Sequence, residues 1–415
     1  MRTNLQSDCK IVRLDVFLCV IKREIEKRLI QLSEKFPVVT VIGPRQSGKT
    51  TLVKMIFPDK EYVNLEEPDT RLFAQQDPRS FLLNRKAGLI IDEAQRVPDL
   101  FSYIQATVDE KQITGNFILT GSHNFLMHEK ISQTLAGRTA ILTLLPFSLN
   151  EIFSVKSDSD FANFIFRGFY PPIYDRNIEP GDWYPNYTHT YIERDVRLIK
   201  NIPDLNSFTL FVKLCAGRIG QLLNLSSLAA DAGISVNTVK SWLSVLEASY
   251  LIFRLEPHYQ NFNKRLVKMP RLYFYDTGLA CSLLGLENLK QVNTHFLLGA
   301  LFENLVISDL LKYKMNKGLN CNFYFWRDKL GREVDCLIDF GLNKSILEIK
   351  AGRTINEEFF KGLTYYKKLA GDEHISAYLI YGGDKEEVRS SGKVLPWNKA
   401  TEVFKDIGNQ RKNIN

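Results

Sequence analysis

The stretch Val38-Val39-Thr40-Val41-Ile42-Gly43-Pro44-Arg45-Gln46-Ser47-Gly48-Lys49-Thr50 decides the fold of this chain. Its first five residues predict a buried strand, and Thr51–Phe57 predicts a helix. Between strand and helix, every fixed position of the pattern GxxxxGK[ST] is filled. Glycines in such a loop let the backbone approach a phosphate closely, and the helix N-terminus adds positive potential. We therefore expect a phosphate-binding loop for ATP.

Two residues of this loop have specific expected roles. Lys49 would reach the terminal phosphates, and Thr50 would offer its hydroxyl to Mg²⁺. A glycine-rich loop that merely caps a helix is the alternative, and the strand before it and the helix after it disfavour that alternative. The expected nucleotide-binding set is Gly43, Pro44, Arg45, Gln46, Ser47, Gly48, Lys49, Thr50, Thr51 and Asp92.

A second acidic motif supports the first. Leu89-Ile90-Ile91 is an apolar strand that ends in Asp92 and Glu93. A carboxylate at the end of a buried strand needs a cation as its partner, so we expect Asp92 to hold Mg²⁺ through water and Glu93 to polarise the attacking water. By itself the acidic pair could equally cap the following helix, but beside the phosphate loop a catalytic role is favoured.

Short apolar strands alternate with helical stretches up to residue 145, which predicts an α/β fold with a mostly parallel sheet. A helical, aromatic-rich region follows from about residue 151 to residue 224. The predicted strands of the sheet are Val38–Ile42, Glu61–Leu65, Leu89–Ile91, Phe117–Leu119 and Ala140–Leu145.

Composition narrows the class of protein. The 415 residues carry 54 Lys and Arg against 47 Asp and Glu, a net charge of +7, and 12% of them are aromatic. This aromatic content excludes a disordered chain, and the apolar runs are too short for a membrane span. The six cysteines are scattered without a CxxC pair, which argues against structural zinc and disulfides. We expect a reduced, cytoplasmic protein that permits nucleic acid as a partner.

The segment Leu225–Leu255 predicts a helix-turn-helix, with a turn at Gly233-Ile234-Ser235. Tyr250–Leu255 and Arg271–Tyr275 could be the two strands of a wing. The expected recognition helix offers only Lys240 as a base, whereas a groove reader usually has several donors. The stretch from residue 258 to residue 271 has no acid and is expected to contact phosphates, although an internal packing module is equally favoured. Its bases are Lys264, Arg265, Lys268 and Arg271.

The sequence around the phosphate loop resembles the AAA-type branch of P-loop ATPases. In that family the strand Phe117–Leu119 would end in a polar sensor of the terminal phosphate, for which this chain offers Thr120, Ser122 or Asn124. The resemblance also implies that Arg138 is an arginine finger, acting in cis or on a neighbouring subunit of a self-associated protein. Arg194 would be a second sensor. Threonine at a strand end and arginine before a strand are also common surface residues, and this alternative stays open.

Residues 21–400 are similar to a family of prokaryotic AAA-type ATPases that carry a C-terminal domain of unknown function. Residues before Lys22 lie outside the resemblance and are read as a mis-chosen start. The similarity rests on Gly43–Thr50, Ile91-Asp92-Glu93-Ala94-Gln95, Tyr191-Ile192-Glu193-Arg194-Asp195, Phe274-Tyr275-Asp276-Thr277-Gly278-Leu279 and Leu347-Glu348-Ile349-Lys350-Ala351-Gly352.

The last part of the chain carries a further acidic constellation. Asp335, Glu348 and Lys350 lie on successive predicted strands, and Glu303 lies on the helix before them. Such a set can bind Mg²⁺ and hold a hydroxide for attack on a phosphodiester. It resembles the PD-(D/E)xK nucleases, although Val334 replaces the proline of the motif. ExK is a frequent tripeptide, so an ordinary charged strand end is the alternative, and cleavage itself is the less favoured outcome.

We therefore expect an ATP-hydrolysing module whose nucleotide state controls a nucleic-acid-binding and nuclease-like domain. A DNA-binding switch without cleavage, and a signalling ATPase that oligomerises on ATP and recruits proteins, are the alternatives. The expected divisions are an N-terminal extension (1–20), an ATPase domain (21–155), a helical connection (156–224), a winged helix-turn-helix (225–290), a nuclease-like α/β domain (291–385) and a tail (386–415).

Overall fold

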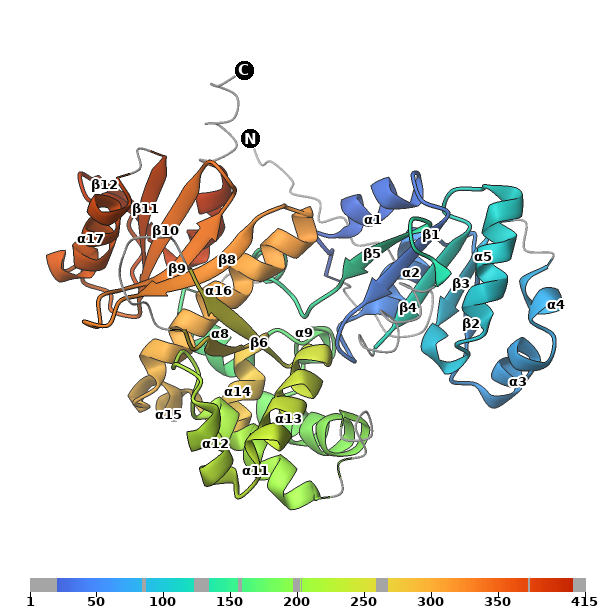
Figure 1. Ribbon diagram of the computed structural model, residues 1–415, viewed down its shortest axis with the longest axis horizontal. Helices are drawn as coiled ribbons and strands as arrows, with labels where there is room; N and C mark the ends of the chain where they lie inside the picture. The colour runs from blue at the N-terminus through green and yellow to red at the C-terminus, as the bar shows by residue number, and fades with distance from the viewer. Residues whose placement is uncertain are drawn as a thin grey trace, which may run out of the picture.

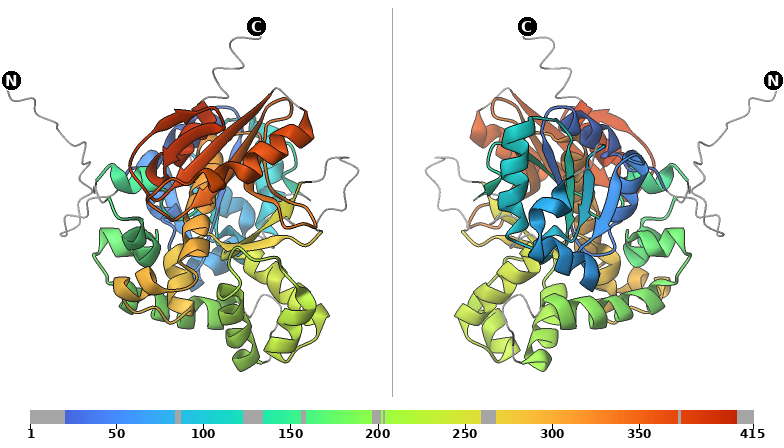
Figure 2. Two further views of the ribbon diagram at one scale, coloured as in Figure 1. Left: turned by 90° about the vertical axis from the view of Figure 1, so that its left-hand side faces the viewer. Right: turned by 90° about the vertical axis from the view of Figure 1, so that its right-hand side faces the viewer.

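The computed structural model describes residues 21–83, 87–122, 134–155, 159–196, 202, 204–258, 268–371 and 374–405, and of residues 193–196 only the backbone. Two sheets lie apart, with the N-terminal sheet on the right of Figure 1 and the C-terminal sheet on the left. Helices of the middle segment lie below both sheets, as the two side views of Figure 2 also show. The predicted fold class is confirmed: a parallel P-loop sheet, a helical middle and a mixed α/β C-terminal part.

The N-terminal sheet has five parallel strands in the order β2-β3-β4-β1-β5. All five were predicted, and β1 has the predicted bounds because its apolar run is bounded by Pro37 and Gly43. In a parallel sheet the carboxyl ends of the strands meet at one edge, which is where ligands bind in such folds. The strands are β1 (Val38–Ile42), β2 (Glu61–Asn64), β3 (Leu89–Asp92), β4 (Phe117–Gly121) and β5 (Thr139–Thr143).

Helices cover both faces of this sheet. Leu29 of α1 and Leu52 of α2 pack on the face that carries Val39 and Val41, whereas Phe101 of α5 packs on the opposite face. Alternate strand residues are thus buried on both sides, which explains why the strands read as continuous apolar runs. The helices are α1 (Glu26–Ser33), α2 (Lys49–Ile56), α3 (Pro68–Gln76), α4 (Pro78–Leu82) and α5 (Leu100–Lys111).

The middle of the chain is helical, as predicted, and includes the two helices of the expected helix-turn-helix. Gly233 between them has φ 66°, the left-handed conformation that a glycine adopts without strain. The helices are α7 (Leu149–Phe153), α8 (Phe161–Arg167), α9 (Pro171–Asp175), α10 (Pro180–Tyr187), a π-helical turn (Thr188–Val196), α11 (Leu205–Ala216), α12 (Leu225–Ala232), α13 (Val236–Ala248), α14 (Thr277–Leu283) and α15 (Leu289–Thr294).

The C-terminal sheet has eight strands in the order β12-β13-β11-β10-β9-β8-β6-β7. Helix α16 packs on one face, and α17 packs on the other. The strands are β6 (Ile252–Pro257), β7 (Arg271–Phe274), β8 (Asn322–Arg327), β9 (Glu333–Asp339), β10 (Lys344–Lys350), β11 (Ile375–Tyr381), β12 (Glu387–Arg389) and β13 (Gly392–Pro396), and the helices are α16 (Leu298–Lys317) and α17 (Lys361–Ala370).

The structure bears on two expectations about this part. The predicted wing strands, β6 and β7, do pair antiparallel, but they extend the C-terminal sheet because β6 also pairs with β8 through Glu256 and Pro257. The segment from residue 386 to residue 405 was expected to be part of a tail, but it is folded. Strands β12 and β13 complete the sheet, and Trp397 and Val403 are buried in the core.

The motif Phe274–Leu279 has a packing role. Asp276 is buried, caps α14 by accepting from the Leu279 N–H (2.8 Å), and accepts from the Phe169 N–H (2.7 Å) and the Tyr184 hydroxyl (2.7 Å). Burial raises the pKa of Asp276. A Cβ atom at Gly278 would lie 2.4–2.6 Å from the Tyr184 side chain, so only glycine fits there. These contacts lock α14 onto the helices of the middle segment.

In the part of the chain that the structure describes, no helix is long and apolar enough to cross a membrane.

Gly278→Ala is expected to lower the midpoint of thermal unfolding, because the added methyl group overpacks the contact with Tyr184 at a cost of about 1–3 kcal/mol. Gly299→Ala is the matched control, since a Cβ at this other helical glycine meets no atom within 4 Å. Thermal unfolding followed by circular dichroism measures both. Equal midpoints for the two variants would contradict the packing role of Gly278.

Candidate functional site

The phosphate loop connects β1 to α2 at the carboxyl edge of the N-terminal sheet. Gly43 has φ 149°, and a Cβ there would lie 2.1 Å from the carbonyl oxygen of Leu144, so the loop passes close to the chain that follows β5. Gly48 has φ 90° and precedes the first residue of α2. The backbone geometry thus requires the two glycines of the pattern.

Lys49 is buried at the start of α2. Its Nζ donates to the carbonyl oxygens of Gly43 (3.0 Å) and Pro44 (2.8 Å), so the ammonium group lies inside the loop where phosphate oxygens would replace these acceptors. Burial lowers the pKa of Lys49 to about 8, against the opposing charges of Glu93 and Asp92. The structure therefore holds this lysine where the sequence predicted it.

The Asp92 carboxylate accepts hydrogen bonds from hydroxyl groups on three elements. Thr50 donates to its Oδ2 at 2.7 Å, Tyr62 donates to the same oxygen at 2.8 Å, and Thr120 donates to its Oδ1. Burial raises the pKa of the Tyr62 phenol, and so does its hydrogen bond to the Asp92 carboxylate. Thr50 and Asp92 supply the hard oxygen donors that Mg²⁺ prefers, and this donor set fits the expected ion.

Glu93 follows Asp92 in a left-handed conformation with φ 53°, a costly backbone geometry of the kind that clusters at functional sites. Its Oε2 accepts from Ser122 (3.0 Å) and from Gln95. Thr120 and Ser122, the expected sensors, thus lie directly against the two acids at the end of β3. Asn124, the third candidate, lies outside the described residues.

The expected arginines meet different outcomes. Arg138 directly precedes β5, and its carbonyl accepts from the Val38 N–H (3.2 Å), while its guanidinium binds Asp109 (2.5 and 2.9 Å). Val38 is the first residue of β1, whereas the phosphate loop begins after its last residue, so Arg138 and the loop lie at opposite edges of the sheet. The prediction that Arg138 acts in cis is therefore wrong, and its action on a neighbouring subunit stays a prediction. The side chain of Arg194 lies outside the described residues.

Arg23 is a site residue that the sequence did not reveal. It is 6% exposed, and its guanidinium donates to the carbonyl oxygens of Ser47 (2.8 Å) and Leu145 (2.7 Å) and to Glu151 Oε1 (3.1 Å). Glu151 is held by the capping box of α7 with Ser148. The Ser148–Glu151 spacing was readable as a capping box, but nothing local connects it to Arg23.

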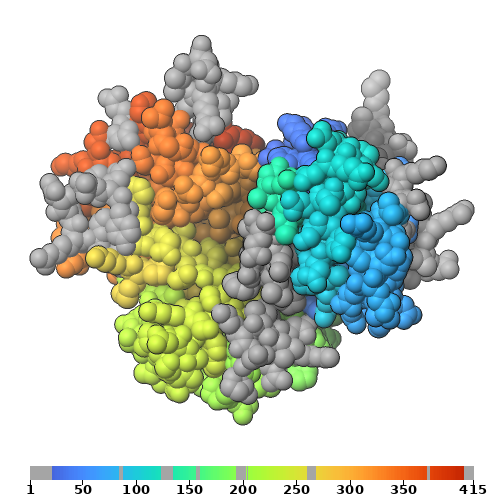
Figure 3. Space-filling model, turned by 45° about the vertical axis from the view of Figure 1, so that its right-hand side comes forward, coloured from blue at the N-terminus to red at the C-terminus, as the bar shows by residue number. Residues whose placement is uncertain are grey.

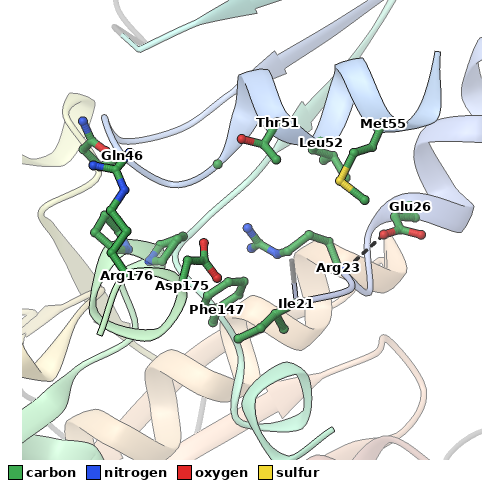
Figure 4. Close-up of a pocket in the computed structure, with 13 residues that line it drawn as sticks. Ile21, Arg23, Glu26, Gln46, Thr51, Leu52, Met55, Phe147, Asp175 and Arg176 are labelled. Atoms are coloured by element: carbon green, nitrogen blue, oxygen red, sulfur yellow. Dashed lines mark hydrogen bonds between the residues drawn. The ribbon is translucent and has the colours of Figure 1, made fainter. Parts of the chain in front are cut away.

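A cavity of about 110 Å³ opens beside the phosphate loop, between α2 and α9 (Figure 4). Apolar side chains, among them Ile21, Leu52, Met55 and Phe147, form much of its wall. The Oδ1 atom of Asp175 is buried there without a hydrogen-bond partner, and burial raises the pKa of this carboxyl to about 6. Apolar walls with a few polar groups are typical of small-molecule sites.

The four residues of the second constellation do come together. Lys350 Nζ lies 2.6 Å from Glu348 Oε1 and 3.2 Å from Asp335 Oδ2, and the Ile349 N–H donates to Asp335 (2.9 Å). Burial, followed by the charge of Asp335, raises the pKa of both Glu348 and Glu303. We call Glu303, Glu333, Asp335, Glu348 and Lys350, together with Arg271, the C-terminal cluster.

Arg271 corrects an expectation. It was predicted to contact phosphates from a wing, but it is 3% exposed and its guanidinium binds Glu303 (3.1 Å) inside the C-terminal cluster. Lys264 and Arg265 lie outside the described residues, while Lys268 and Lys240 are exposed.

The comparisons with known proteins agree with this architecture. Residues 35–153 match an AAA domain, residues 158–290 match a domain of unknown function (DUF8612), and residues 298–400 match another (DUF4143). The chain therefore combines an AAA-type P-loop ATPase domain with a C-terminal domain of unknown function, as the sequence predicted.

Uncharacterized proteins of Mycobacterium bovis and Mycobacterium tuberculosis are each 29% identical over 340 residues, which cover 80% of this chain and 74% of the relative. Among solved structures, a Walker-type ATPase of Pyrococcus abyssi is 16% identical with a TM-score of 0.42, covering 64% of this chain and 96% of that one. The Holliday junction branch migration motor RuvB of Thermotoga maritima is 18% identical with a TM-score of 0.28, covering 55% and 88%.

The pKa of Lys49 gives a pH dependence for nucleotide binding. Because the pKa is lowered to about 8, the lysine loses its proton above that pH in the free protein, and it must regain one to bind phosphate. The affinity for ATP is expected to fall above pH 8 by up to about tenfold per pH unit. Calorimetry at pH 9 in buffers of different ionisation enthalpy should detect proton uptake on binding. An affinity that stays constant from pH 7 to pH 9.5 would contradict this.

Proposed function

We propose that this protein binds and hydrolyses ATP with Mg²⁺, and that its nucleotide state controls a C-terminal domain that acts on nucleic acid. The AAA domain supports nucleotide binding. The single observation that carries the control is the chain of buried contacts that leads from the phosphate loop, through Arg23, to the helix that bears Glu303.

The chemistry of ATP hydrolysis follows from the loop and the acids beside it. Lys49 would bind the terminal phosphates, and Thr50 and Asp92 would hold Mg²⁺, which neutralises charge on the phosphate oxygens. Glu93 would orient and deprotonate the attacking water, with Ser122 fixing its carboxylate. Thr120, whose hydroxyl donates to Asp92, would sense the terminal phosphate by changing the position of this carboxylate when the phosphate is bound or released.

The cavity beside the loop would take the rest of the nucleotide. It is lined by Gly48 and Thr51, which would adjoin the phosphates, and by apolar residues that include Ile21 and Pro171. A planar base packs well between such walls, and Asp175 could accept a hydrogen bond from an amino or hydroxyl group. The cavity residues Ile21, Pro171 and Asp175 lie outside the phosphate-loop motif, so they support nucleotide binding independently of it.

The route to the C-terminal domain begins at the backbone of the loop. Arg23 binds the Ser47 carbonyl and Glu151 of α7, and the first N–H of α7, that of Leu149, donates to Asp309 of α16 (2.8 Å). Asp309 lies six residues, about 9 Å, along α16 from Glu303. A shift of the loop on nucleotide binding would therefore move the helix that carries a residue of the C-terminal cluster.

The same helix also holds strand β7. Asn304, next to Glu303, accepts from the Phe274 N–H (2.7 Å) and donates to the Phe274 carbonyl (2.9 Å). The N-terminal ATPase part and the C-terminal part, which these contacts link, lie side by side in the space-filling view (Figure 3). The C-terminal cluster, with its carboxylates and Lys350 on adjacent strands, supports a role on phosphodiesters. The exposed Lys268 and Lys240, near the helix-turn-helix, could contact phosphates.

Lys49→Ala and Asp92→Asn are expected to reduce ATP turnover about a hundredfold or more, because they remove the phosphate and Mg²⁺ contacts. Glu93→Gln should retain ATP binding and lose hydrolysis. Lys35→Ala, a change of the same type outside the site, is the control. Phosphate release and nucleotide binding measure these variants, and hydrolysis retained by Lys49→Ala would refute the assignment.

The control by nucleotide is tested with Glu93→Gln, which should stay in the ATP-bound state. Its affinity for single-stranded DNA, double-stranded DNA or RNA is expected to differ with and without ATP by about fivefold or more for at least one of them. Adding Asp309→Ala should reduce that difference without weakening ATP binding, whereas Lys290→Ala, a change of an exposed lysine on α15, should not. Affinities that ATP leaves unchanged on all three nucleic acids would contradict the proposal.

A further inference from the structure

A side-chain cation lies at the centre of the C-terminal cluster. The guanidinium of Arg271 has Nη1 at 3.1 Å from Glu303 Oε1 and at 3.5 Å from Asp335 Oδ1. Its Nη2 lies 2.5 Å from Glu333 Oε2, and its carbon lies 4.9 Å from the centre of the Phe325 ring. The side chain is 4% exposed. Arg271 thus lies between carboxylates of α16 and β9, where a metal ion would bridge them.

A second observation is independent of the first. Glu348 is 8% exposed, and its Oε2 is buried without a hydrogen-bond partner, while its Oε1 binds Lys350. A buried carboxylate oxygen without a partner is costly, so it indicates a ligand that donates or carries positive charge. Glu348, Glu303 and Asp335 would supply oxygen donors of the kind that Mg²⁺ and Mn²⁺ prefer.

The present arrangement does not fit a metal. Among the residues that the structure describes, no group of three or more His, Cys, Asp or Glu side chains is arranged to hold one. The physical reason is Arg271, which already neutralises Glu303 and Asp335. Glu333 also binds Arg327 (3.5 Å), so without the charge of Arg271 the remaining carboxylates, Glu303, Asp335 and Glu348, would have Lys350 as their counter-ion. Their mutual repulsion would favour a cation that could enter.

We propose that Arg271 is an internal counter-ion that closes a divalent-cation site, so that Arg271 and a divalent cation exclude each other at the C-terminal cluster. The strand that carries Arg271 is held by Asn304 on α16, next to Glu303. The guanidinium therefore stays between the carboxylates as long as these two hydrogen bonds keep β7 on α16. The inference rests on the proposed action of the C-terminal domain on nucleic acid, and it names Arg271 as the residue that keeps the cation site of that domain closed.

The test is Mn²⁺ binding to the full chain without ATP or nucleic acid, so its failure is separate from failure of the proposed function. Calorimetry and electron paramagnetic resonance would compare the unmodified protein, Arg271→Gln and Arg271→Gln/Glu303→Gln. Arg271→Gln is expected to bind one Mn²⁺ about tenfold or more tighter than the unmodified protein, and the double variant is expected to lose this site. Arg332→Gln, which removes a 44% exposed guanidinium from the same domain, should bind as the unmodified protein does.

Thermal unfolding provides a second readout. Mn²⁺ should raise the unfolding midpoint of Arg271→Gln by more than that of the unmodified protein, because the loop site at Thr50 and Asp92 is present in both proteins and only the variant has the opened cluster. If Arg271→Gln folds poorly, Mn²⁺ is expected to restore its folding. Three results would overturn the proposal: tight Mn²⁺ binding that is equal with and without Arg271, a folded Arg271→Gln that gains no site, or a misfolded one that Mn²⁺ does not rescue.

Discussion

The buried guanidinium of Arg23 is the contact on which the arrangement of this protein depends. It joins the segment before α1 to the phosphate loop, to the chain after β5 and to Glu151 at the start of the middle segment. Removing one partner of such a buried pair leaves an uncompensated charge at a cost of about 3–5 kcal/mol. Because the acceptor on the loop is the carbonyl of Ser47, the position of Arg23 depends directly on the conformation of the loop that would hold phosphate.

Helix α16 extends this dependence across the molecule. Asp309, in the middle of this helix, accepts from α7. Glu303 and Asn304, which lie between one and two turns nearer its start, contact Arg271 and the backbone of β7. A helix transmits displacement along its axis because its own hydrogen bonds keep it stiff. The protein therefore has a short, buried connection between its nucleotide site and its C-terminal cluster.

Much of the N-terminal half could be predicted from sequence because its signals are local. The strand before Gly43 and the acids after Ile91 each lie within a few residues of the pattern that identifies them, and the structure has both elements there. Arg23 could not be predicted, since its partner Glu151 is 128 residues away. Arg271 was misread for a related reason: its neighbours in sequence lack acids, whereas its neighbours in space are Glu303, Glu333 and Asp335.

Hydrogen exchange of the Glu93→Gln protein, with and without ATP and Mg²⁺, tests the central claim most directly, because it reports backbone opening element by element. The account predicts that ATP changes exchange in the phosphate loop and also in α7, α16 and β7, along the contacts of Arg23 and Asp309. A change confined to the loop, α2 and the end of β3 would mean that the nucleotide site and the C-terminal cluster are independent, and would contradict the account.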